Sequence, residues 1–264
     1  MSDFIEVSET EKVLTETDKL KIAKNSETKI SEFKRNKLEI DAKRHWDIFY
    51  KNNTANFFKD RNWLEKEFDS LNLSSRKVVL ELGAGVGNTV FPLAESSEHL
   101  KIYAAEFSSR AVLLLNQRAA TQNVSSRVEG HVSDITQEDY SFLKEKVDVV
   151  FMIFVMSAIS PQKFQQVIEN LLPCLNPGAK VFFRDYAVND HAMVRFKPGK
   201  CISDRFYVRQ DGTRSYFFKL EELKELFIKN GAQVLNLNYV SRKTVNKAEN
   251  VNLQRTFLQG TFQF

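Results

Sequence analysis

Apolar residues along the chain follow two patterns, and the change between them predicts the elements. Short runs rich in apolar and β-branched residues indicate strands, and they cover residues 77–83, 101–108, 126–134, 147–159 and 179–188. Helical patterns lie between them, at residues 87–97, 109–123 and 161–175. Strands that alternate with helices predict an α/β fold, with a mostly parallel sheet and helices on both faces.

Both ends of the chain add to this core. One helix and two strands are predicted within residues 222–264, and the strands would pair antiparallel at the edge of a seven-stranded sheet. Residues 1–28 are polar and mixed in charge, which indicates a flexible tail or a loosely docked helix. Helical patterns follow, so residues 29–70 are predicted to form a helical extension ahead of the main domain at residues 71–264.

Composition adds exclusions. The 264 residues fit one large domain with appendages. No apolar run approaches the roughly 18 residues of a membrane span, and the acidic N-terminus lacks a signal core, so a cytoplasmic protein is expected, with the nucleus as a second location. Cys174 and Cys201 are far apart and the four histidines are scattered, so neither a disulfide framework nor a metal site is expected.

Basic charge gathers in two blocks. Residues 31–66 hold nine Lys or Arg against six acids, and residues 191–219 hold seven against two. Such blocks around an acidic middle favour a core that binds a small ligand and flanks that bind a polyanion. Solvated lysine faces would explain the charge equally well.

A glycine-rich turn follows the first predicted strand of the sheet. Gly83, Gly85 and Gly87 stand at the turn into a helix, where α/β folds bind ligands and where glycine lets the backbone approach them. Asn88 replaces the third small residue of a dinucleotide fingerprint, which disfavours NAD. Glu106 ends the next strand, where a carboxylate would bind a ribose, so either a nicotinamide or an adenosyl cofactor remains open at this point.

Longer motifs narrow the choice by resemblance. LELGAGVGN, AAEFSSRA, VSDI, DVVFMIFVMSAI and LNPGAKVFFRDY resemble the Rossmann-like class I S-adenosylmethionine-dependent methyltransferases. WDIFYKNNTANFFKDRNWLEKEF, FRDYAVNDHAMVRF and FYVRQDGTRSYFF are similar to the tRNA 3-methylcytidine methyltransferases, which modify cytidine 32 of the anticodon loop. The resemblance runs from about residue 40 to the C-terminus. The chain departs from the family at Ala84, commonly cysteine, and at Glu106, commonly aspartate.

The resemblance implies a set of contacts to S-adenosylmethionine, whose product is S-adenosylhomocysteine. They would come from Trp46, Tyr50, Gly83, Gly85, Gly87, Glu106, Asp134, Ile135 and Ile153. Each has an alternative interpretation: Trp46 and Tyr50 are spaced for core packing, Asp134 could cap a following helix, and Ile153 lies in a run that is buried anyway.

Methylation of cytosine N3 requires no general base, because N3 of the neutral base carries a lone pair and no proton. The enzyme must instead extrude the base and hold it in line. A carboxylate near the ring would favour the positive charge that develops on it, and Asp185 is the candidate, followed by Asp190. A fixed ion pair between Asp185 and Arg184, or another arginine, is the alternative.

RNA contacts are expected from the basic blocks, with residues 191–219 as a substrate-binding insertion. Aromatic faces for stacking and cations for phosphates are interleaved there. The candidates are Phe57, Phe58, Lys59, Arg61, Arg184, His191, Arg195, Arg209 and Arg214. Core packing is the alternative for the aromatic residues.

Within the family, FYVRQDGTRSYFF followed by KTVNK resembles the members that act on serine tRNA. This resemblance implies tRNA as substrate and seryl-tRNA synthetase as a partner. Threonine tRNA, a small-molecule or protein substrate, and a catalytically silent RNA-binding subunit are the alternatives. The intact glycine turn with Glu106 disfavours the silent subunit, and the basic flanks disfavour a small substrate.

Overall fold

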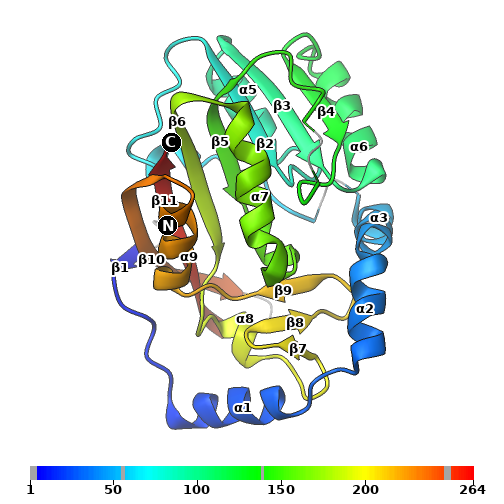
Figure 1. The fold of residues 1–264 in the computed structure, drawn as a ribbon, viewed down its shortest axis with the longest axis vertical. Coiled ribbons are helices and arrows are strands. Elements are labelled where there is room, and N and C mark those ends of the chain that lie inside the picture. The colour runs from blue at the N-terminus through cyan, green and yellow to red at the C-terminus, as the bar shows by residue number, and fades with distance from the viewer. Residues whose placement is uncertain (1–4, 55–56, 138–139, 247–250) are drawn as a thin grey trace.

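The structure is a computed structural model that describes residues 5–54, 57–137, 140–246 and 251–264. These residues form an eight-stranded sheet in the order β1-β10-β11-β6-β5-β2-β3-β4 (Figure 1). Its five parallel strands are β6 (Leu175–Tyr186), β5 (Val147–Ile153), β2 (Lys77–Leu82), β3 (Leu100–Glu106) and β4 (Val128–Val132). Two antiparallel strands continue the sheet, β11 (Val251–Gln263) and β10 (Gln233–Asn246). The predicted seven strands are therefore present.

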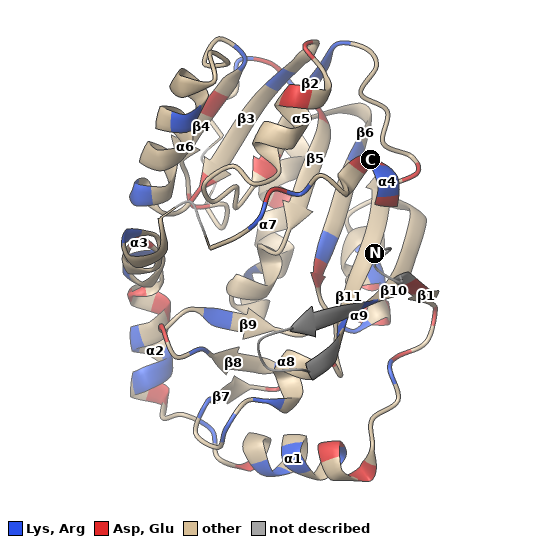
Figure 2. Ribbon diagram, turned by 180° about the vertical axis from the view of Figure 1, so that it is seen from behind, with Lys and Arg blue, Asp and Glu red and all other residues tan. Residues whose placement is uncertain are grey.

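Helices cover both faces because the central strands are apolar on both sides. Along β2, Leu80 belongs to the hydrophobic cluster on one face and Val79 to the cluster on the other. α7 (Phe164–Leu171) and α9 (Leu220–Lys229) lie over one face (Figure 1), and α5 (Val90–Ser96) lies in front of the other in Figure 2. α6 (Ser109–Thr121) contacts β4. Ser108 caps α6 by accepting a hydrogen bond from the Ala111 amide, which starts this helix directly after β3.

The eighth strand comes from the N-terminal segment that the sequence predicts as a flexible tail or a loosely docked helix. β1 (Ile5–Ser8) pairs antiparallel with β10. α1 (Glu16–Glu27) lies across the bottom of the molecule in Figure 1. Asn25 is buried and donates to the carbonyl of Phe196, and Ser26 shares a 3.2 Å hydrogen bond with Tyr207. Residues 5–28 are thus docked at both ends, while residues 1–4 lie outside the described part.

The helical extension is shorter and more broken than its pattern predicts. α2 (Glu32–Ile40) and α3 (Ala42–Asn53) run along one edge of the molecule and meet at Asp41 (Figure 1). Among residues 57–70 of the predicted extension, helix is limited to the single turn α4 (Leu64–Glu67). Asn88 explains the loop before α4: its side chain donates 3.1 Å hydrogen bonds to the Phe58 carbonyl and to Asp60, which hold this stretch extended over the glycine turn.

The basic insertion forms a small lobe. It holds α8 (His191–Val194) and a three-stranded sheet of β7 (Cys201–Ser203), β8 (Phe206–Val208) and β9 (Arg214–Tyr216). In Figure 1 this lobe lies between α1 and the main sheet. Lys and Arg occur on β9 and, mixed with acidic residues, on α2 (Figure 2).

Within the described ranges, no helix combines the length and apolar character needed to cross a bilayer. The same ranges hold no group of three or more His, Cys, Asp or Glu side chains that could bind a metal ion.

Candidate active site

A cavity of about 390 Å³ lies beyond the carboxyl ends of the parallel strands. It is within the size range of small-molecule sites. Its walls come from the glycine turn, the ends of β3, β5 and β6, the helices α2 and α3, and the basic insertion. The cavity therefore joins the core of the sheet to both basic blocks.

Gly83 and Gly85 form one wall, and both have the left-handed backbone that favours glycine, with φ of 67° and 57°. A Cβ on Gly83 would lie 2.2 Å from the Val155 side chain. Gly87 does not line the cavity. A Cβ there would lie 2.4 Å from the Phe91 ring, so this glycine serves the packing of α5 rather than a ligand contact.

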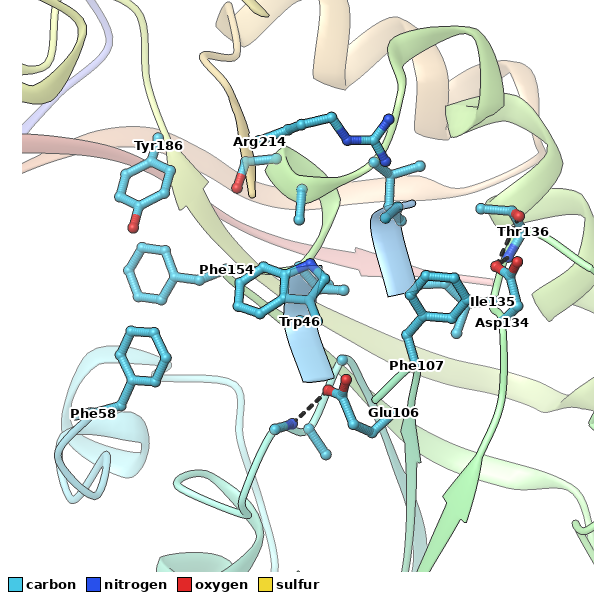
Figure 3. Close-up of a pocket in the computed structure, with 18 of the residues that line it drawn as sticks. Trp46, Phe58, Glu106, Phe107, Asp134, Ile135, Thr136, Phe154, Tyr186 and Arg214 are labelled. Atoms are coloured by element: carbon cyan, nitrogen blue, oxygen red, sulfur yellow. Dashed lines mark hydrogen bonds between the residues drawn. The ribbon is translucent and has the colours of Figure 1, made fainter. Parts of the chain in front are cut away.

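Glu106 forms the floor. It is buried at the end of β3, and its two carboxylate oxygens accept 2.8 Å hydrogen bonds from the amides of Gly85 and Ser108. The bond from Gly85 is the dashed line at Glu106 in Figure 3. Burial raises the pKa of this carboxyl, while the backbone hydrogen bonds oppose the rise. Each oxygen keeps further acceptor capacity, and the carboxylate lines the cavity, so it is suited to bind a ribose diol.

Asp134, Ile135 and Phe107 lie together on one side of the cavity (Figure 3). Asp134 accepts hydrogen bonds from the amide and hydroxyl of Thr136, at 3.0 and 2.8 Å, and so closes a turn after β4 rather than capping a helix there. Ile135 and Phe107 offer apolar faces for a flat ring. These residues and Glu106 fit the two halves of an adenosyl group, a planar base and a diol.

The structure places Ile153 elsewhere. Its side chain is fully buried in the core with Phe151, and the next residue, Phe154, lines the cavity. Successive side chains along β5 point to opposite faces of the sheet, so Ile153 lies on the same face as Phe151 and not on that of Phe154.

Trp46 and Tyr50 of α3 cover the glycine turn. Both line the cavity, and their rings stack at 6.0 Å. Burial raises the pKa of Tyr50, chiefly by desolvation. Asp47 fixes α3 to the start of α6 by accepting hydrogen bonds from the Ser108 hydroxyl, at 2.6 Å, and the Arg110 amide. Both aromatic residues pack against neighbouring rings and also line the cavity. Their spacing therefore serves core packing and leaves them available for a cofactor contact.

An aromatic wall stands opposite Ile135 and consists of Phe58, Phe154, Tyr186 and Phe257. Figure 3 shows the first three stacked along one side of the cavity. The centroid of Phe154 lies 5.3 Å from those of both Tyr186 and Phe257. Phe154 has a left-handed φ of 59°, a strained backbone that is typical of functional sites.

Three arginines lie over this wall. Their guanidinium carbons are 5.7 Å from the Phe154 centroid for Arg61, 5.4 Å from Tyr186 for Arg209, and 5.6 Å from Tyr186 for Arg255. All three line the cavity. Arg255, Phe154, Tyr186 and Phe257 are not among the site residues that the sequence predicts. Once the strand order is known, their positions at strand ends or beside β6 indicate that they belong to the site. Aromatic faces with nearby guanidinium groups can hold a flat base and its phosphates.

Arg214 lines the far rim, where Glu39 of α2 pairs with it and with Lys163, the latter at 2.6 Å. These ion pairs lower the pKa of Glu39 against the opposing effect of its partial burial. The rim thus ties the helical extension to the insertion.

The two candidate catalytic acids do not line the cavity. Asp185 is fully buried and accepts 2.8 Å hydrogen bonds from the amides of Ser157 and Tyr186; burial raises its pKa to about 6. Asp190 is fully buried as well, accepts from the amides at the start of α8 and at residue 256, and pairs with Arg255 at 3.0 Å. Both acids therefore fix neighbours that face the cavity.

Arg184 is also inside. It pairs with Glu67 at 2.6 Å and lies 4.3 Å from the Trp63 ring, on the opposite side of β6 from Asp185. Its side chain therefore does not line the cavity, and its ion pair is with Glu67 rather than with Asp185. Four further candidates do not line the cavity: Phe57, Lys59 and Arg195 are exposed, and His191 on α8 is half-buried.

Known proteins share both the sequence and the fold. A family model described as a methyltransferase domain matches residues 80–181. The chain is 43% identical to the tRNA N(3)-cytidine methyltransferase METTL6 of Pongo abelii, over 95% of this chain and 90% of that one. It is 37% identical to the tRNA(Thr) (cytosine(32)-N(3))-methyltransferase of Saccharomyces cerevisiae, over 92% of this chain and 40% of that one.

Among solved structures, the glycopeptide N-methyltransferase MtfA in complex with S-adenosylmethionine superimposes with a TM-score of 0.54 at 15% identity, covering 78% of this chain and 88% of that one. At this identity the likeness shows the fold. The identity to the first relative extends over nearly the whole chain, including the extension and the insertion that line the cavity. The chain therefore belongs to the S-adenosylmethionine-dependent tRNA N(3)-cytidine methyltransferases.

Proposed function

We propose that this chain methylates N3 of cytidine 32 in the anticodon loop of tRNA, with serine tRNA as the favoured substrate. The carrying observation is the division of one cavity into two chemically different halves. One half holds the glycine turn, Glu106 and Ile135, and the other holds the rings and arginines. S-adenosylmethionine, when bound, supplies a methyl group on a positively charged sulfur.

The first half supports cofactor binding by the chain's own groups. Glu106 would accept hydrogen bonds from the ribose, Ile135 and Phe107 would enclose the adenine, and Gly83 and Gly85 would let the backbone approach the remainder. Tyr50 and Trp46 cover this half and exclude water from it.

The second half supports an extruded base. Phe58, Phe154, Tyr186 and Phe257 offer ring faces along one wall of the cavity, and Arg61, Arg209 and Arg255 offer positive charge for the flanking phosphates. Because neutral cytosine has no proton on N3, the protein has to position the base and need not remove a proton. The buried acids Asp185 and Asp190 act through the elements that they fix.

Mass spectrometry tests this proposal. The purified chain is incubated with unmodified serine tRNA and isotope-labelled cofactor, and the digested nucleosides are separated. We expect labelled 3-methylcytidine, and none from a tRNA that carries uridine at position 32. Label in another nucleoside, or none in RNA while protein or small-molecule acceptors are labelled, would overturn it.

The preference for serine tRNA has a separate basis. Its support is the resemblance of FYVRQDGTRSYFF and KTVNK to the family members that act on serine tRNA. The relative whose name specifies threonine tRNA is the less similar of the two, at 37% identity against 43%. Basic surfaces give RNA affinity with little sequence information, and that affinity falls with salt. A synthetase that already holds serine tRNA would raise the effective concentration of the anticodon loop. We therefore propose seryl-tRNA synthetase as the partner that supplies specificity.

The partner is tested separately. Methylation of purified serine and threonine tRNA is timed at fixed salt with and without the synthetase. We expect the synthetase to increase the methylation rate of serine tRNA strongly and that of threonine tRNA not at all. Equal rates with and without the synthetase would remove it from the mechanism.

A further inference from the structure

Glu81 is a fully buried acid in β2, two residues before the glycine turn. Its Oε1 atom lies 3.1 Å from Nη1 of Arg61, which also donates a 2.5 Å hydrogen bond to the Thr89 hydroxyl. Burying an acid is costly unless it is paired, and an apolar pair of similar volume often stabilises a fold as well or better. Stability alone is thus a weak explanation for this pair.

Arg61 links Glu81 to the cavity. Its guanidinium carbon lies 5.7 Å from the Phe154 centroid, and its side chain lines the wall proposed for the base, whereas Glu81 does not reach the cavity. The backbone of Arg61 is fixed too, because its amide donates a 2.8 Å hydrogen bond to the Asn88 carbonyl. Residues on both sides of the glycine turn therefore hold one arginine of the opposite wall.

We propose that Glu81 is a positioning residue for methyl transfer. It holds the guanidinium of Arg61 over Phe154, at the boundary between the cofactor turn and the aromatic wall, so that Arg61 meets a phosphate beside the extruded cytidine. This inference rests on the proposed function. Without the carboxylate, the long side chain regains rotamer freedom that must be lost again when RNA binds.

Another pair in the chain supplies a matched control. Glu67 and Arg184 also form a buried ion pair, at 2.6 Å, but neither residue lines the cavity. Glu81→Gln and Glu67→Gln make the same chemical change, and the positioning role predicts an effect on catalysis for the first alone.

The experiment is a double-mutant cycle of Glu81→Gln and Arg61→Ala. Single-turnover rates and tRNA affinity are measured at saturating cofactor, with cofactor affinity from calorimetry and unfolding temperature as controls. For Glu81→Gln we expect kcat/KM to fall by roughly tenfold, the scale of one charge-assisted hydrogen bond, and cofactor affinity to stay within about twofold. In the Arg61→Ala background the same change should have little further effect.

Each alternative outcome is decisive. Additive losses in the double variant, unchanged activity in Glu81→Gln, or an equal loss in Glu67→Gln would overturn the positioning role. If Glu81→Gln does not fold, Glu81→Asp replaces it in the cycle, since it keeps the charge and shortens the reach.

tRNA binding without cofactor, measured by fluorescence anisotropy, separates this inference from the proposed function. A wild-type chain that makes no 3-methylcytidine contradicts the function. The same cycle in binding then decides the role of Glu81: non-additive weakening supports it, and additive or absent weakening overturns it.

Discussion

The hydroxyl of Tyr50 lies directly against Gly85: a Cβ added to this glycine would come within 2.5 Å of the tyrosine oxygen. Tyr50 belongs to α3 in the helical extension, and Gly85 belongs to the turn after β2. The extension is therefore packed on the glycine turn itself, and any side chain at Gly85 must displace Tyr50.

Gly85→Ala should weaken cofactor binding by at least about tenfold, because losing the close approach of the backbone and displacing Tyr50 each cost on the order of 1 kcal/mol or more. The left-handed φ adds roughly 1–2 kcal/mol of strain to the folded state. Gly231→Ala is the control, since this glycine has a φ of 89° and nothing within 4 Å of its added Cβ. Calorimetry should separate the two variants; equal cofactor affinities would contradict a role for the contact between Tyr50 and Gly85 in cofactor binding.

Glu106→Ala should raise the cofactor Kd by about 100-fold, because a carboxylate with two charge-assisted hydrogen bonds to a ribose contributes on the order of 3 kcal/mol. The variant also loses the acceptors of the Gly85 and Ser108 amides, so its unfolding temperature should fall. Glu129→Ala, which removes an acid outside the cavity, is the control. Unchanged affinity in Glu106→Ala would remove the ribose assignment.

Arg209→Ala should weaken tRNA binding and reduce its salt dependence by about one counterion, as expected when one phosphate contact is lost. Arg205 is the matched control in the same insertion, because it is already paired with Asp204 and Glu222, at 2.9 and 2.6 Å. Filter binding across a salt series measures both slopes. A larger change for Arg205→Ala would contradict the assignment of Arg209 to the RNA.

Sequence pattern predicts the sheet well, since strands buried on both faces are apolar throughout. It also places Gly83, Gly85 and Glu106 correctly at the cavity, because the ends of neighbouring parallel strands meet at one edge. The motif alone does not reveal that Gly87 differs from the other two, which depends on the Phe91 ring packed against it.

The phase of a strand is harder to read. Alternation puts Arg184 and Asp185 on opposite faces of β6, but the sequence does not say which face meets the cavity, and in fact neither side chain lines it. For the same reason, the sequence predicts Ile153 at the site, whereas the neighbouring residue Phe154 lines the cavity. β1 is harder still, because four residues carry little pattern and their partner strand lies more than 200 positions away.

Two buried acids should give the protein a dependence of stability on pH. Burial raises the pKa of Glu81 from 4.5 to about 7, with Glu106 adding to the rise while Arg61 and Thr89 oppose it, and raises that of Asp185 from 3.8 to about 6. Because each folded pKa lies above the unfolded value, the folded state binds the proton more tightly. The resulting stability is fully present below the unfolded pKa and is lost as pH rises through the folded pKa.

Gln and Asn variants isolate the two windows, because they do not titrate. The free energy of unfolding of Glu81→Gln, measured in denaturant and compared with wild type, should rise relative to wild type between about pH 4.5 and 7, by on the order of 3 kcal/mol. For Asp185→Asn, the free energy of unfolding should rise relative to wild type between about pH 4 and 6. Because the two pH windows differ, each variant is the control for the other. Curves that stay parallel to wild type across pH 4 to 8 would show that these carboxyls keep ordinary pKa values in the folded protein.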